Sequence, residues 1–95
     1  MMLEEKINRI FILLRMGSGP NGLIWLKAWY DEKQLVDNLL KFIEDGKEKG
    51  FSTFFTYRKS LEIVNLVKQD IALALLSPDY FIRLLAETLI TKERQ

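Results

Sequence analysis

Two conformations are open to residues 9–15, Arg9-Ile10-Phe11-Ile12-Leu13-Leu14-Arg15, and the fold class depends on which of them forms. The apolar positions between residues 3 and 14 recur at the spacing of an amphipathic helix. The same stretch is also rich in isoleucine and carries an aromatic ring, a composition that favours strands. The flanking sequence is therefore needed to distinguish a helix from a strand at residues 9–15.

The next apolar segment, Leu23-Ile24-Trp25-Leu26-Lys27-Ala28-Trp29-Tyr30, has a strand-like composition as well, and a glycine-rich loop at residues 17–22 separates the two. Two such runs joined by a short loop of glycine, proline and asparagine are typical of a β-hairpin. Residues 51–57 also have strand composition, and a lone strand would have nothing to pair with. We therefore expect a hairpin and a third strand, with an all-helical start as the alternative.

Three helices are expected in the rest of the chain. Asp31 and Gln34 have the spacing of a capping box and open a helix that runs to about Glu48. A second helix is predicted over residues 60–76. A third is predicted over residues 78–92, with Ser77 as its N-cap. The expected fold is a single α+β domain over residues 1–95 in the order β-β-α-β-α-α, and the alternative is an all-α fold.

Size and composition predict a homodimer. A chain of 95 residues builds only a thin core, and small domains usually add disulfides, a metal or a second subunit. The sequence has no cysteine and no histidine, so neither a disulfide nor a tightly bound zinc is expected. A second subunit is the remaining way to stabilise the domain. The segment 71–76 is apolar all round, as in a helix that is buried on every side or lies at a dimer interface.

The chain is expected to be cytoplasmic, in a host cell if it is viral. Its unbroken apolar stretches are far shorter than the roughly 20 residues of a membrane span, and its first residues are acidic where a secretory signal is basic. The absence of cysteine and histidine and the few Asn and Gln residues also hint at a hot environment.

Enzymatic chemistry is not expected, nor is a cofactor or a metal. Without histidine or cysteine there is no Ser-His or Cys-His pair to activate a nucleophile. Residues 17–22 match G-x-G-x-x-G, but Pro20 and Asn21 favour a hairpin turn over a phosphate-binding helix start. At Asp45 and Asp31 a carboxylate is followed two residues later by a lysine. Both positions lie at the ends of expected helices, so we interpret these residues as charged helix ends and not as a catalytic site.

The segment 47–59 combines aromatic and basic residues. Four aromatic rings fall within residues 51–57, and four cations with one acid bracket them. Proteins that hold single strands without reading sequence use this mixture, because cations follow the phosphates and rings stack on any base. The net charge is only +1, so such binding would depend on local clustering.

The predicted binding site has two parts: the first lies within residues 47–59, and the second is the expected hairpin with Arg15, Trp25 and Lys27. Lys49, Arg58 and Lys59 are the expected phosphate contacts, and the expected stacking residues and supporting cations are Phe54, Tyr57, Trp25, Lys27 and Arg15. Phe54 is the expected stacking residue because, in a strand, it lies on the same face as Arg58. The alternative is that Phe55 and Tyr57, on the opposite face of the strand, are the exposed rings. The alternative is that the aromatic residues fill the core or a dimer interface.

The small size, the lack of cysteine and histidine, and the segment Gly50–Lys59 resemble the small single-stranded-DNA-binding proteins of rod-shaped crenarchaeal viruses, the rudiviruses. The resemblance implies a dimer without an oligonucleotide-binding barrel that binds single strands without sequence preference. It implies a role in viral genome replication or recombination, with single-stranded DNA (or RNA) and replication or recombination proteins as partners. The alternative function is a protein-interaction or regulatory module whose aromatic residues form a dimer or partner interface.

Overall fold

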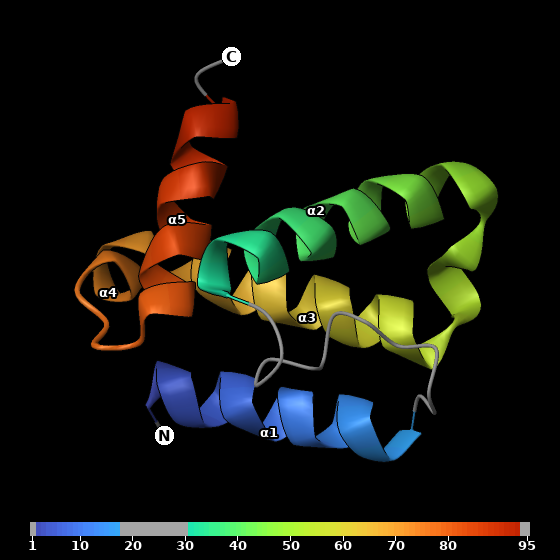
Figure 1. The fold of residues 1–95 in the computed structure, drawn as a ribbon, viewed down its shortest axis with the longest axis horizontal. Coiled ribbons are helices and arrows are strands. Elements are labelled where there is room, and N and C mark those ends of the chain that lie inside the picture. Colours follow the sequence, from blue (N-terminus) through green and yellow to red (C-terminus); the bar gives the residue numbers. More distant parts are fainter. Residues whose placement is uncertain (1, 18–30, 94–95) are drawn as a thin grey trace.

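The computed structural model describes residues 2–17 and 31–93, and all the regular structure in them is helical (Figure 1). The elements are α1 (Leu3–Gly17), α2 (Glu32–Lys49), the 3₁₀ turn η2 (Phe51–Thr53), α3 (Phe55–Gln69), α4 (Ile71–Leu75) and α5 (Tyr80–Glu93). The expected α+β fold is therefore wrong, and the all-α alternative describes these residues.

Residues 9–15 belong to α1 and do not form the first strand of a hairpin. The helix buries Leu3, Ile7, Ile10, Phe11 and Leu14 together on one side. A strand would have turned alternate residues to opposite faces, so it would have exposed part of this set. The segment is helical because only the helical spacing brings all five side chains into one core. The expected second strand, residues 23–30, lies outside the described residues.

Helix α2 begins and ends where its capping signals place it. The Asp31 carboxylate accepts a hydrogen bond from the Gln34 backbone N–H at 2.7 Å, as the capping box predicted. At the other end Gly50 adopts the left-handed conformation, with φ of 76°, and its N–H donates to the Gly46 carbonyl. Glycine takes this conformation without the penalty of a Cβ, which is why the helix stops there.

The third expected strand, residues 51–57, is also wrong. After Gly50 the chain forms η2 and then enters α3 at Phe55. The rings find apolar partners without a sheet: Phe42 of α2 lies 6.3 Å from Phe51 and 6.2 Å from Tyr57, measured between ring centroids. Packing against α2 thus overrides the strand preference of the individual residues.

The helix expected over residues 60–76 starts earlier and is broken. It begins at Phe55, and Asp70 interrupts it and caps α4 by accepting a hydrogen bond from the Leu73 N–H at 3.1 Å. Helix α5 begins two residues later than predicted. Its first turn is capped by the Asp79 carboxylate, which accepts from the Phe81 N–H at 2.9 Å, while Ser77 accepts from the Asp79 N–H.

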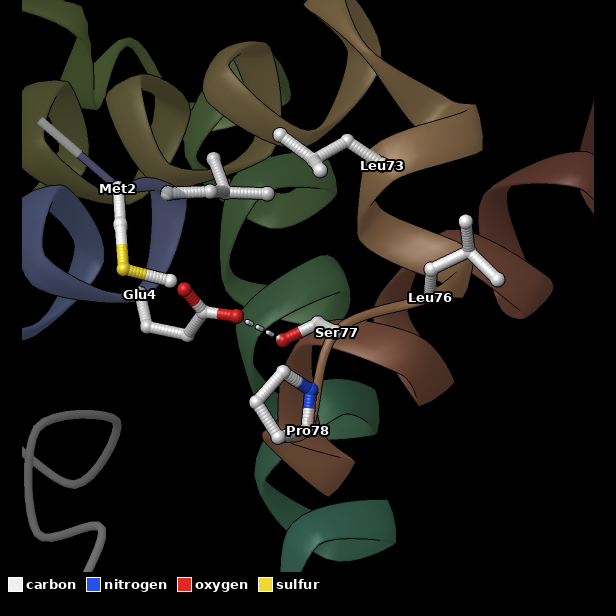
Figure 2. A pocket seen from close by; sticks show the side chains of 7 residues that line it. Met2, Glu4, Leu73, Leu76, Ser77 and Pro78 are labelled. Carbon is white, nitrogen blue, oxygen red and sulfur yellow. Dashed lines mark hydrogen bonds between the residues drawn. The ribbon is translucent and has the colours of Figure 1, made fainter.

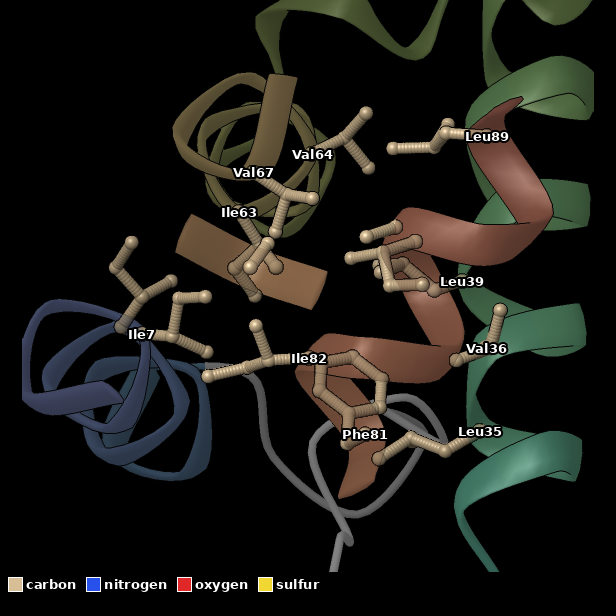
Figure 3. Packing of buried hydrophobic residues seen from close by; sticks show 14 of the residues in the cluster. Ile7, Leu35, Val36, Leu39, Ile63, Val64, Val67, Phe81, Ile82 and Leu89 are labelled. Carbon is tan, nitrogen blue, oxygen red and sulfur yellow. The ribbon is translucent and has the colours of Figure 1, made fainter. Parts of the chain in front are cut away.

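Helix α3 lies at the centre of the arrangement and packs against α1, α2 and α5 (Figure 1). Helices α1 and α3 run side by side in opposite directions, and α5 stands at a steep angle to both, next to α4. Side chains from α1, α2, α3 and α5 meet in one core (Figure 3), where Phe81 packs edge-on against Phe11 at 5.4 Å. No helix within residues 2–17 and 31–93 is long and apolar enough to span a membrane.

Candidate interaction surfaces

The aromatic turn, formed by Phe42, Phe51, Phe54, Phe55 and Tyr57, joins α2 to α3. The rings of Phe51 and Phe54 are stacked, with centroids 5.3 Å apart and planes inclined by 26°. The backbone supports this arrangement, because the Phe54 N–H donates to the Phe51 carbonyl at 2.9 Å. The rings of Phe42, Phe51, Phe54 and Tyr57 therefore form one connected cluster that runs from the half-buried Phe42 to the exposed Phe54.

Tyr57 does not offer an open ring for stacking. Only 4% of its surface is accessible, because the ring lies directly against the backbone of α2 at Gly46. A Cβ at Gly46 would come within 2.5 Å of the Tyr57 ring. The expectation of an exposed Tyr57 is therefore wrong, and this residue closes the α2–α3 packing.

Phe54 and Phe55 are the open rings of the turn. Phe54 is 57% accessible and Phe55 is 38% accessible. The strand argument that paired Phe54 with Arg58 does not apply to a helix, but the two residues are still one turn apart. The Arg58 N–H donates to the Phe54 carbonyl at 3.0 Å, and Arg58 is exposed. The structure thus places Phe54 and Arg58 one helical turn apart along the backbone, and both are exposed.

The other two predicted phosphate contacts differ from each other. Lys59 lies 5.6 Å from the centroid of the Phe55 ring, and its ammonium forms an ion pair with Glu62 at 2.9 Å. Lys49 is exposed at the C-terminal end of α2. Acidic residues accompany them, with Glu44 and Glu48 also exposed on α2. Acidic and basic residues are interspersed around the aromatic turn, so its described residues do not form a strongly cationic groove.

The second part of the predicted site is not described by the structure. Trp25 and Lys27 lie outside the described residues, and Arg15 is described only as part of the backbone of α1. The first strand of the expected hairpin does not form, because residues 9–15 are helical.

An apolar surface that we call the α4 patch lies at the other end of the molecule, where α4 meets the start of α1 (Figure 2). It consists of Met2, Leu73, Leu76 and Pro78 around a shallow hollow of about 220 Å³. Leu76 is 82% accessible, Met2 61% and Leu73 51%. Burying one such side chain typically contributes about 1.5–3 kcal/mol, so this patch leaves substantial binding free energy unused.

The polar groups beside the α4 patch are already satisfied. The Ser77 hydroxyl donates to the Glu4 carboxylate at 2.6 Å, which links α1 to the loop before α5 (Figure 2). The Arg83 guanidinium donates to the Ser77 carbonyl at 2.7 Å. A ligand of this patch would therefore gain little from new hydrogen bonds, and the surface fits apolar side chains.

Sequence reasoning did not name Leu73 or Leu76, although the signal was present. The segment 71–76 was interpreted as fully buried or at a dimer interface, and only Ala74 within it is buried in the monomer. The leucines of this segment are exposed, so it is not buried on every side.

Together these features define a small helical domain with an exposed aromatic turn and an exposed aliphatic patch. No protein-family model, curated protein or solved structure is significantly similar to this chain. The function must therefore be argued from the two surfaces.

Proposed function

We propose that this chain is a protein-interaction module that forms a homodimer through the α4 patch. The observation that carries the proposal is the exposure of Leu73 and Leu76 beside Met2, on a helix whose sequence has no polar residue between Asp70 and Ser77. Contiguous exposed apolar side chains are typical of protein–protein contacts.

A second copy of the chain is the occupant that the surface fits best. A two-fold interface brings each patch against itself, so a charged patch would repel its own copy. Among the described residues that line the hollow, Glu4 is the one that carries a charge, and it is hydrogen-bonded to Ser77. The size of the chain supports the same conclusion, because a 95-residue domain without disulfides gains stability from a second subunit.

The test is the molar mass in solution of the wild type and of the variant Leu73→Lys/Leu76→Lys. We expect the wild type at twice 11.2 kDa by light scattering, and the variant at 11.2 kDa because two ammonium groups from each copy would meet in the interface. A wild type that stays monomeric at its highest soluble concentration would rule out the dimer.

Ile12→Lys is the matched control, since Ile12 is also an exposed aliphatic side chain and lies on α1 away from the hollow. This variant should keep the wild-type mass. Circular dichroism should show the same helix content for all three proteins. If Ile12→Lys also dissociates the dimer, the interface lies elsewhere.

Single-stranded nucleic-acid binding at the aromatic turn is the second candidate. The specific observation in its favour is the open Phe54 ring one helical turn from Arg58. Stacking on such a ring is worth roughly 1–3 kcal/mol per base, whichever the base. Under this candidate the chain would serve the replication or recombination of a genome, as its resemblance to the viral proteins implies.

A fluorescence titration with a thymidine oligonucleotide at low salt tests this candidate. Two results would support it. Binding should weaken as salt rises, because salt reduces the gain from counterion release. Binding should also weaken about tenfold in Phe54→Ala, because this variant loses the stacking ring. Ile12→Ala is the control and should bind as the wild type does. A wild type that leaves the signal unchanged in excess oligonucleotide would eliminate nucleic-acid binding at this turn.

A further inference from the structure

A second groove runs between α1 and α3, and none of its lining residues belongs to the α4 patch. It is open and has a volume of about 250 Å³. The residues that line it are Lys6, Arg9, Ile10, Leu13, Glu62 and Leu66. They come from α1 and α3, which run side by side in opposite directions (Figure 1).

The spacing along each helix explains why these residues share one groove. Lys6, Arg9 and Leu13 are three and four residues apart on α1, and Glu62 and Leu66 are four residues apart on α3. Residues three and four apart lie on one side of a helix. Each wall of the groove therefore carries charged residues at one end and a leucine at the other.

The floor of the groove is aliphatic. Ile10 is buried, Leu66 is half-buried and Leu13 is exposed. The nearest aromatic ring on the same side of α3 is Phe55, which already faces the Lys59 ammonium. The floor thus fits leucine or isoleucine side chains better than nucleic-acid bases.

The charge of the groove is unbalanced. Glu62 is neutralised by its ion pair with Lys59. Lys6 and Arg9 are exposed, and neither forms an ion pair with a side chain in the described part of the chain. Within the described residues, the α1 wall therefore presents two cations without a carboxylate partner along one edge of an apolar floor.

We propose that this groove binds an amphipathic acidic segment of another protein. Apolar side chains of that segment pack on Ile10, Leu13 and Leu66, and its carboxylates pair with Lys6 and Arg9. This inference rests on the proposed function in treating the chain as a protein-binding module. It does not rest on self-association, because no residue lines both surfaces.

A random peptide library selected on the immobilised full-length protein tests the proposal. Enriched peptides should combine Asp or Glu with Leu, Ile or Phe at helical spacing. The best peptide is then labelled, and its affinity is measured by fluorescence anisotropy. In Lys6→Glu/Arg9→Glu the affinity should fall on the order of tenfold or more, because two charge pairs become repulsive.

Three further proteins make the result specific. Lys6→Gln/Arg9→Gln should give a smaller loss without any repulsion, and it guards against misfolding of the charge-reversed variant. Lys47→Glu/Lys49→Glu reverses two exposed lysines at the aromatic turn and should bind the peptide as the wild type does. Leu73→Lys/Leu76→Lys should also bind normally, so that loss of the dimer and loss of the groove are distinguished.

The proposal is overturned if the enriched peptides are basic or uncharged, or if the best peptide binds Lys6→Glu/Arg9→Glu as tightly as the wild type. It is also overturned if a thymidine oligonucleotide displaces the peptide and shows the same dependence on Lys6 and Arg9, because the groove would then be a phosphate site.

Discussion

Gly46 is the residue at which α2 and α3 come closest to each other around the aromatic turn. A Cβ at this position would meet two carbons of the Tyr57 ring at 2.5 and 2.6 Å and the Phe51 Cβ at 3.2 Å. Alanine favours a helix interior over glycine by about 1 kcal/mol, whereas overpacking costs about 1–3 kcal/mol. The buried Tyr57 ring has little room to move, so we expect Gly46→Ala to lower the free energy of unfolding by about 1 kcal/mol in urea denaturation.

Gly50 provides the matched comparison, because its requirement is conformational and not steric. Nothing lies within 4 Å of a Cβ at this position, but its φ is 76°. Asparagine tolerates this left-handed conformation better than alanine does. Gly50→Asn should therefore be more stable than Gly50→Ala, whereas Gly46→Asn should be no more stable than Gly46→Ala. If Gly46→Ala is as stable as the wild type, the close packing of Tyr57 is not required.

At the scale of elements, capping residues and helical spacing were the informative signals in the sequence. The Asp31–Gln34 pair predicted the start of α2 correctly. The spacing of apolar residues in α1 also points to a helix, whereas the strand preferences of its individual residues point to a hairpin strand that does not form. The strand expected over residues 51–57 failed because the ring contacts with α2 depend on Gly46, and composition does not reveal how closely two helices approach.

The predicted site illustrates the same difference between local and tertiary information. The sequence identified an aromatic and basic segment, and Phe54 and Arg58 are indeed exposed neighbours. The burial of Tyr57 depends on which helix packs against which, so it was not predictable from local patterns. The ion pair of Lys59 with Glu62 lies within α3, and its i,i+3 spacing follows once this segment is known to be helical. The α4 patch needs both Asp70, which starts a new helix, and the approach of Met2 from the other end of the sequence.

At the scale of the whole molecule, the chain is compact but leaves much apolar surface uncovered. Its radius of gyration is 12.6 Å, close to the roughly 12 Å expected for a folded domain of this length. The buried core comes mainly from four of the helices, whereas α4 adds the buried Ala74 and the partly buried Ile71 and exposes its leucines. Part of the stability of such a domain can therefore come from association, which makes stability depend on concentration.

The thermal midpoint should report this dependence. If folding is coupled to dimerisation through the α4 patch, the wild-type Tm rises by a few degrees for each tenfold increase in protein concentration, because mass action favours the dimer. Leu73→Lys/Leu76→Lys should melt at a lower temperature that does not change with concentration, since that variant unfolds from a monomer. Differential scanning calorimetry over a wide range of concentrations measures both. A wild-type midpoint that does not vary with concentration would mean that the exposed leucines do not stabilise the fold through a second copy.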